Sequence, residues 1–203
     1  MHEIKKPYHH GNLKNALLQA GMQLLEQDGL SGLSLRSIAA RVGVSHTAPK
    51  NHFGSLRGLL TALAAEGFVL HAATMQQGVD AATDPTGRQR AAMVGYVDFA
   101  RAHPQLFALM FSPFYCDISD PALHAAGQAS RAVLAGISKG LDRDKADQPG
   151  AVRQAEMMLW SLVHGYATLL LNGHFHASSM RDQFFDITDI MPVFGCLDTA
   201  LPD

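Results

Sequence analysis

The chain has 203 residues, of which 47% are hydrophobic and 17% charged, and its formal net charge is −2. This apolar content can form a hydrophobic core, which excludes intrinsic disorder, and the length allows one or two domains. Cys116 and Cys196 lie far apart, which excludes a disulfide framework and a thiolate metal cluster and favours a reducing cytoplasm. The N-terminus lacks a long apolar segment, and polar residues interrupt the most apolar stretch, 157–171. We therefore expect neither secretion nor a membrane span.

The first eighty residues predict four helices. Apolar residues recur at three- and four-residue spacing from Leu13, and Gly29 and Gly32 end that pattern. Ser34 is suited to cap the next helix, and Ser55 to cap the fourth, because a serine hydroxyl can accept an unpaired first-turn amide. The predicted ranges are 13–27, 35–42, from 45 or 46 to about 53, and from 56 to about 82.

Helical patterns continue to the C-terminus after a turn at 83–87. Asp120 followed by Pro121 is a typical helix start, because proline at the first helical position loses no hydrogen bond. A polar linker is expected at 142–150, and Pro192 should bend the last helix. The predicted helices run to about 103, then over 104–111, 121–140, 151–172 and about 180–197. No segment reads as a strand, so we expect an all-α fold of about nine helices.

The charge is unevenly distributed along the chain. Residues 1–57 hold seven Lys or Arg against three Asp or Glu, a net +4, whereas the remainder carries −6. This split favours a small module that meets a polyanion, joined to a larger one that does not. With so few charges, a chance imbalance is the alternative.

The residues around Gly43 predict a helix-turn-helix. Such a motif needs a small residue where its helices cross, a glycine in the turn and flanking apolar residues, and Ala39, Gly43, Ile38 and Val44 supply them. The second helix would then present His46, Thr47, Lys50, Asn51 and His52 to the major groove. An ordinary pair of packed helices would show the same spacing.

The wider run from Leu33 to Ala39, with Gly43–His46 and His52–Phe53, resembles the DNA-binding domain of the TetR family of bacterial transcriptional regulators. The likeness extends from an N-terminal arm at 8–13 to Leu59–Leu60. It implies an N-terminal three-helix DNA-binding domain over residues 1–55. Residues 56–203 would form a helical domain for ligand binding and dimerisation.

A second likeness lies at Trp160–Gly165, which is similar to the Trp-His-Gly signature of one branch of the family, and 99–111 also match that branch. Together the resemblances imply a homodimer that binds an inverted-repeat operator in double-stranded DNA, most often as a repressor, and responds to a small-molecule effector. Such a protein acts in the bacterial cytoplasm, on the nucleoid.

Three positions depart from the family pattern. Lys50 stands where an aromatic residue is usual, although lysine can still meet phosphate as a point charge. Pro49 is acceptable if the helix begins one residue late, so that the proline lies in its first turn. Leu56–Arg57 replaces a usual Lys-Glu pair, and Arg57 can substitute for the lost lysine. The alternative function is therefore a helical ligand-binding protein or enzyme that no longer binds DNA specifically.

The resemblance divides the expected DNA contacts into three groups. Phosphate contacts are expected from Arg36, Lys50 and Thr47, and base contacts from His46 and Asn51. An arm of Lys5, Lys6, His9 and His10 would add attraction to phosphate, unless it is only a solvated tail. Ser34, Ser45, His52 and Arg57 complete the predicted DNA-binding set.

Aromatic and methionine side chains concentrate in the second half, where they can line a ligand cavity or simply form core. The net negative charge there argues against an anionic effector. The predicted ligand-binding residues are Tyr96, Phe99, His103, Phe107, Met110, Phe111, Phe114, Trp160 and His164.

No cofactor or metal is expected, because His174 and His176 lack a clustered carboxylate or thiolate. The chain carries none of the common catalytic motifs, so we expect no enzyme activity. The apolar helix at 151–172, with the last helix, is the predicted dimer interface, although both could instead fill one monomer core.

Overall fold

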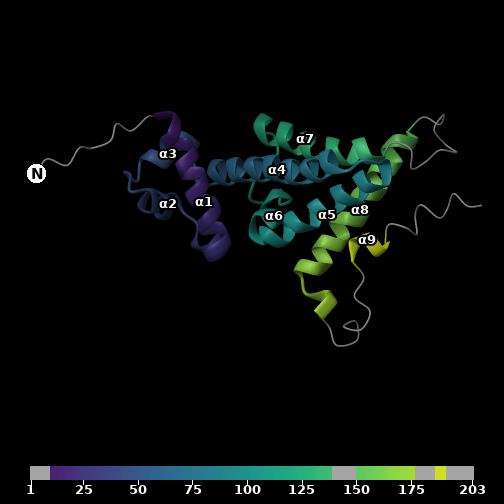
Figure 1. Ribbon diagram of the computed structural model, residues 1–203. Helices are drawn as coiled ribbons and strands as arrows, with labels where there is room; N and C mark the ends of the chain where they lie inside the picture. The colour runs from purple at the N-terminus through teal and green to yellow at the C-terminus, as the bar shows by residue number, and fades with distance from the viewer. Residues whose placement is uncertain (1–9, 139–149, 177–185, 191–203) are drawn as a thin grey trace, which may run out of the picture. The chain divides into compact units, whose positions relative to one another are not determined.

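The computed structural model describes residues 10–138, 150–176 and 186–190, and these residues contain helices and no strand (Figure 1). The all-α prediction is confirmed. The helices are α1 (His10–Gly32), α2 (Leu35–Val42), α3 (Ala48–Phe53), α4 (Leu56–Ala81), α5 (Pro85–Ala102), α6 (Pro104–Met110), α7 (Pro121–Ser138), α8 (Ala151–Leu171) and α9 (Ile187–Ile190), with a 3₁₀ turn at His174–His176. The rest of the predicted last helix, including Pro192, lies outside the described residues.

The predicted capping residues fix several helix ends. The Asp120 carboxylate accepts the N–H groups of Ala122 and Leu123, each at 2.9 Å. The Ser55 hydroxyl accepts the Gly58 N–H at 3.0 Å at the start of α4. Each bond satisfies an amide that has no partner within its own helix.

The first and third helices differ in their boundaries from the sequence prediction, and the first begins at His10 rather than at residue 13. The first helical segment extends to Gly32, but Gly29 has a φ of +66° and interrupts it, which explains why the periodic pattern stops near residue 27. The third helix begins at Ala48 rather than at 45 or 46. Pro49 therefore lies in its first turn, where the missing N–H removes no helical hydrogen bond.

The chain forms two compact units that share α4. The first comprises residues up to Gly67 together with Gln105–Ala125, and the second comprises Phe68–Pro104 with the residues from Ala126 onward. The predicted boundary after residue 55 lies at the start of α4 and inside the first unit, which therefore contains more than the helix-turn-helix.

The core of the first unit joins α1, α2 and the first half of α4. Leu17, Ile38, Leu59 and Leu63 are completely buried there. The Glu26 carboxylate on α1 accepts the N–H groups at the start of α6, from Leu106 at 2.9 Å and Gln105 at 3.2 Å. A carboxylate at a helix N-terminus stabilises the helix, so this bond holds α6 against α1.

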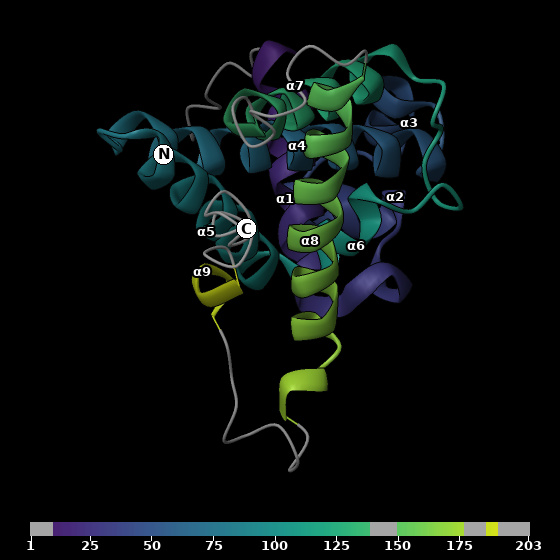
Figure 2. The same ribbon diagram turned by 90° about the vertical axis from the view of Figure 1, so that its right-hand side faces the viewer.

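The core of the second unit lies where α5 packs on α8 and on the second half of α4. Figure 2 shows α8 as one long helix, with α9 next to α5. Gly95 lies against the backbone of α4, because a Cβ at this position would be 3.0 Å from both the Met75 Cα and the Thr74 oxygen. The absence of a side chain allows this close approach of the two helices.

One described helix, α4, is long and apolar enough to cross a membrane by length and composition. Helices in the core of a folded protein meet the same criterion, and α4 supplies buried residues to both units, including Leu59, Leu63 and Met75. Packing within the protein therefore accounts for its apolar composition.

We expect Gly95→Val to lower the free energy of unfolding by about 1–3 kcal/mol, because its side chain would push against the α4 backbone. Urea denaturation measures the change. The matched control is Gly136→Val on α7, where a Cβ meets no atom within 4 Å, and its effect should stay within about 0.5 kcal/mol. Equal effects of the two substitutions would contradict the close approach at Gly95.

Candidate functional site

The first half of the candidate DNA-binding site is α2, whose start is fixed by a reciprocal pair of hydrogen bonds. The Ser34 hydroxyl accepts the Ser37 N–H at 3.0 Å, and the Ser37 hydroxyl accepts the Ser34 N–H at 2.9 Å. This capping box orients the first turn of the helix. Arg36 lies exposed in that turn, where it can reach a phosphate.

The turn between α2 and α3 depends on Gly43, whose φ of +75° is costly for any residue with a side chain. Its N–H donates to the Ala40 carbonyl at 3.2 Å, and the Val44 N–H donates to the Ala39 carbonyl at 3.0 Å. These bonds use carbonyls that the end of α2 would otherwise leave unpaired. The turn therefore sets the direction in which the chain leaves α2.

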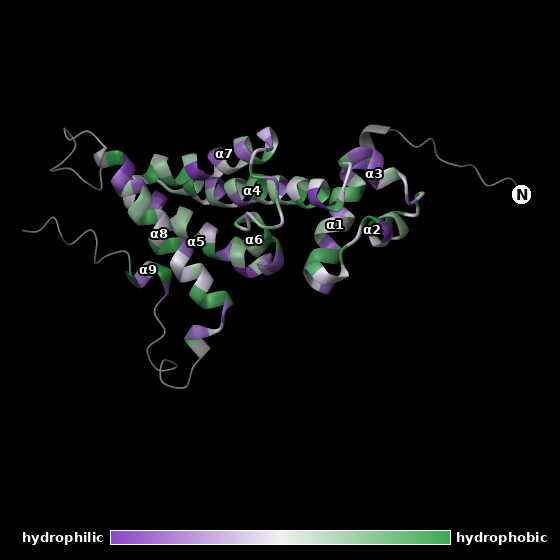
Figure 3. Ribbon diagram, turned by 180° about the vertical axis from the view of Figure 1, so that it is seen from behind, coloured by the Kyte–Doolittle hydropathy of each residue, from purple (hydrophilic) through white to green (hydrophobic). Residues whose placement is uncertain are grey.

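The second half of the site is α3 and the turn that precedes it. Buried Pro49 anchors the helix, and the Ser45 and Thr47 hydroxyls lie 3.0 Å apart in the turn. In Figure 3 the ribbon of α3 is largely in the hydrophilic colour. The predicted residues on this segment are all exposed: Ser45, His46, Thr47, Lys50, Asn51 and His52.

The two cationic side chains predicted to meet phosphate, Arg36 and Lys50, have no acidic partner among the residues that the structure describes. Within the described residues, neither Arg36 nor Lys50 lies within 4.0 Å of a carboxylate oxygen. Uncompensated cations on an exposed helix attract a polyanion. The structure thus brings the central predicted contacts together on α2, α3 and their turn.

The remaining predicted DNA contacts are the N-terminal arm and Arg57. Lys5, Lys6 and His9 lie outside the described residues, and His10 is the first residue of α1. The Arg57 guanidinium donates to the Cys116 carbonyl at 2.9 Å, within the first unit. Arg57 therefore holds the segment after α6, a role that its sequence position did not indicate.

Neighbouring contacts hold the same segment against α4. The Thr61 hydroxyl accepts the Asp117 N–H at 2.9 Å and donates to the Arg57 carbonyl at 2.8 Å. The Cys116 thiol is buried, and burial raises its pKa to about 11. A thiol that stays protonated at neutral pH is a packing group rather than a nucleophile.

The predicted ligand-binding residues fall into both compact units. Phe107, Met110, Phe111 and Phe114 belong to the first unit, where Phe107 and Met110 are core and Phe114 is 80% exposed. The second unit holds Tyr96, Phe99, His103, Trp160 and His164. The burial of Phe107 and Met110 and the exposure of Phe114 show that these side chains do not share one environment, so the second set is the stronger candidate.

Three residues of the second set, Tyr96, Trp160 and His164, form a polar cluster between α5 and α8. The Tyr96 hydroxyl and His164 Nδ1 are 2.9 Å apart, and the Trp160 ring lies 6.3 Å from the His164 ring. Arg131 joins Glu156 at 2.8 Å and lies over the Trp160 ring at 5.5 Å. Burial raises the pKa of Tyr96 and lowers that of His164, so both groups are neutral at pH 7.

Sequence reasoning missed His71, which belongs to the same cluster. Its ring is buried 4.3 Å from the Tyr96 ring and 5.0 Å from the Phe99 ring, and its Nδ1 is 2.7 Å from the Ser130 hydroxyl. Burial, followed by the charge of His164, lowers its pKa to about 3. A histidine within the apolar pattern of α4 was the only available signal.

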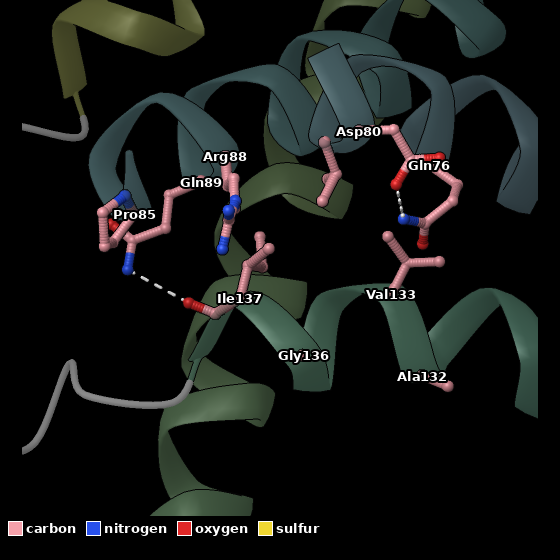
Figure 4. Close-up of a pocket in the computed structure, with 10 residues that line it drawn as sticks. Gln76, Asp80, Pro85, Arg88, Gln89, Ala132, Val133, Gly136 and Ile137 are labelled. Carbon is pink, nitrogen blue, oxygen red and sulfur yellow. Dashed lines mark hydrogen bonds between the residues drawn. The ribbon is translucent and has the colours of Figure 1, made fainter. Parts of the chain in front are cut away.

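The second unit also contains a cleft of about 580 Å³ between α4, α5 and α7 (Figure 4). None of the predicted ligand-binding residues lines it. Over the parts of the chain that the structure describes, no three metal-ligating side chains come together.

Two family profiles match this chain. Residues 17–63 match one described as bacterial regulatory proteins, tetR family, and residues 89–188 match one described as tetracyclin repressor-like, C-terminal domain. No curated protein matches the chain.

Several solved structures are similar over nearly the whole chain. A protein of unknown function from Rhodococcus sp. RHA1 is 33% identical, with a TM-score of 0.75 over 95% of this chain and 96% of that one. The regulator FadR from Bacillus subtilis, solved with stearoyl-CoA, is 15% identical, with a TM-score of 0.60 over 91% and 96%. The TetR-like regulator LfrR from Mycobacterium smegmatis, solved with proflavine, is 20% identical, with a TM-score of 0.58 over 93% and 98%. At these identities, the similarity of FadR and LfrR to this chain shows a shared fold.

We expect acid to destabilise the protein through His71. Below pH 6.5 the unfolded chain binds a proton at this residue, whereas the folded protein does so only near pH 3. The free energy of unfolding should therefore fall by about 2 kcal/mol between pH 7 and pH 5 from this group alone. Urea denaturation at several pH values measures the slope.

Two variants isolate that contribution. His71→Asn keeps a polar group near Ser130 and should flatten the pH dependence, although it lowers stability at pH 7. His124→Asn changes an exposed histidine on α7 and should leave the slope unchanged. An unaltered slope in His71→Asn would refute the assignment.

Proposed function

The chain belongs to the TetR family of bacterial regulatory proteins, and we propose that it is a dimeric repressor whose operator is an inverted repeat. A small molecule bound in the second unit would release the operator. Members of this family are DNA-binding transcriptional regulators. What we propose for this chain is its type of operator, its dimeric state and its control by a small molecule. Its place of action is the bacterial cytoplasm, where the chromosome lies.

The observation that carries the proposal is the exposure of α3 together with its preceding turn. Side chains suited to DNA lie along one short helix, with Lys50 next to Asn51. Lysine meets phosphate, and an asparagine amide can form two hydrogen bonds with adenine in the major groove. We assign Arg36, Thr47 and Lys50 to phosphate, and His46 and Asn51 to base edges.

The proposed dimer interface is a stripe on α8. Met158, Leu162, Gly165 and Leu169 follow one another at intervals of four, three and four residues, which places them on one face. Met158 and Leu169 are 40% and 45% exposed, and a Cβ at Gly165 would meet no atom within 4 Å. A second copy of α8 would cover this face and bring two copies of α3 to one duplex.

Two features of the second unit, a polar cluster and a cleft, support control by a small-molecule effector. FadR and LfrR were solved with stearoyl-CoA and proflavine, so two proteins of this fold bind small molecules. In this chain the second unit contains the polar cluster of Tyr96, Trp160 and His164 and a separate cleft. Either can hold a ligand whose binding alters the DNA-binding unit.

The direct test selects bound sequences from a random duplex pool and repeats the binding at several salt concentrations. Enrichment of an inverted repeat, with steep salt dependence, is the expected result. Weak binding without sequence preference would overturn the proposal and favour the alternative, a ligand-binding protein that has lost specific DNA recognition.

We expect Lys50→Gln to weaken binding to every duplex by a similar factor, because it removes a phosphate contact. The slope of log K against log salt should become shallower by about 0.9 for each half-site, since one fewer counterion is released. Fluorescence anisotropy of labelled duplexes measures both. Arg153→Gln, which removes an exposed cation from α8, is the matched control and should leave the slope unchanged.

Asn51→Ala should act differently, by relaxing the preference at one base pair of each half-site. The expected loss of binding energy for the selected operator is about 1–3 kcal/mol, with little change for random duplexes. Competition binding against operators substituted at single positions measures it. A uniform loss across all duplexes would instead assign Asn51 to the backbone.

Leu169→Glu should convert the dimer to a monomer, because it places a charge within the proposed apolar interface, at the C-terminal end of the stripe. Light scattering gives the mass, and operator affinity should fall with it. Val69→Glu, at an apolar position on α4 that is 51% exposed, is the control that should remain dimeric. A dimeric Leu169→Glu would place the interface elsewhere.

A further inference from the structure

The cleft in the second unit differs in character from the aromatic cluster that the sequence suggested. Three helices form its walls, and the Gln89 side chain fixes two of them by donating to the Ile137 carbonyl at 3.0 Å (Figure 4). Its volume of about 580 Å³ is in the range of small-molecule sites. The residues that line it are Gln76, Val79, Asp80, Pro85, Arg88, Gln89, Ala132, Val133, Gly136 and Ile137.

Arg88 and Asp80 line this cleft with opposite charges and do not form an ion pair with each other. Among the described residues, the Arg88 guanidinium has neither a carboxylate within 4.0 Å nor a hydrogen-bond acceptor, so Arg88 and Asp80 are too far apart to neutralise each other. Asp80 accepts one hydrogen bond, from Gln76 Nε2 at 2.7 Å, which leaves its second oxygen available. Each charge can therefore bind a ligand group of opposite sign.

Two further charged residues lie near the cleft, but they do not change the charge of its lining. The Asp84 carboxylate accepts the Gly87 N–H at 2.9 Å as the cap of α5, and Arg90 donates to the Thr188 carbonyl at 3.4 Å. Neither residue lines the cleft. The lining therefore contributes one positive and one negative charge.

Apolar side chains and open space complete the lining. Val79 comes from α4, and Val133 and Ile137 come from α7. Gly136 lies beside them, and a Cβ there would meet no atom within 4 Å. This arrangement suits a ligand with an apolar middle section.

We propose that this cleft binds a small dipolar molecule, with its carboxylate at Arg88, its ammonium group at Asp80 and an apolar spacer between them. A ligand with one charge would gain from one residue and be repelled by the other, whereas a dipolar ligand gains from both. Binding at the cleft requires only the second unit. Its role as the effector site rests on the proposed function.

The test uses ω-amino carboxylates of increasing chain length as probes, from β-alanine to 8-aminooctanoate. Isothermal titration calorimetry on the full chain compares each with the carboxylate and the amine of the same length. We expect one chain length to bind best, and at least tenfold more tightly than either singly charged analogue. Equal binding of the analogues, or no binding of any probe, would overturn the proposal.

Substitutions of residues that line the cleft test whether the probe binds there. Arg88→Gln should weaken the best probe at least tenfold, and Arg90→Gln, two residues further along α5, should not. Gly136→Leu should fill the cleft and abolish binding, whereas Gly136→Ala should retain most of it. Asp80→Asn should remove the preference for an ammonium group, so that the plain carboxylate binds as well as the dipolar probe. Binding that survives both Arg88→Gln and Gly136→Leu would refute the site.

A second measurement separates this proposal from the proposed function. The best probe is added to the protein bound to its selected operator, and the release of DNA is followed by anisotropy. Binding with release supports both proposals. Binding without release keeps the site but overturns its role as effector site, and operator binding by a protein that binds no probe overturns the site alone.

Discussion

The backbone conformation at Gly43 is the constraint on which the DNA-binding surface depends. Its positive φ lets the Gly43 and Val44 amides reach back to the last carbonyls of α2, so that helix ends and the chain turns within a few residues. Pro49 then lies in the first turn of α3 and is buried. Since both ends of the turn are fixed by local hydrogen bonding and packing, the exposed residues of α3 keep one orientation relative to α2.

The position of Arg57 shows why a departure from a family pattern needs a structure to interpret it. From sequence, an arginine near the start of α4 substitutes for a missing lysine at the DNA backbone. In the structure it donates to the Cys116 carbonyl, and Thr61 on the next turn binds Asp117. These contacts join residues more than fifty positions apart, so no local pattern could have indicated them.

Sequence predicted those features that local chemistry determines. The capping residues Ser34, Ser55 and Asp120 and the turn at Gly43 follow from single residues and their neighbours, whereas the start of α3 was predicted two or three residues too early. The polar cluster and the cleft could not be predicted in this way. They depend on which faces of α4, α5, α7 and α8 meet, and a histidine or arginine in an amphipathic pattern does not reveal its partner.

At both candidate sites, side-chain charges without an ionic partner among the described residues determine which ligand can bind. The two sites differ in the signs of these charges, so they select different ligands. On α2 and α3, Arg36 and Lys50 add charges of one sign on an exposed surface, which selects a polyanion. In the cleft, Arg88 and Asp80 place one charge of each sign around apolar side chains. The net charge of −6 after Arg57 argues against a purely anionic effector, and a dipolar ligand removes that conflict because it brings no net charge into the second unit.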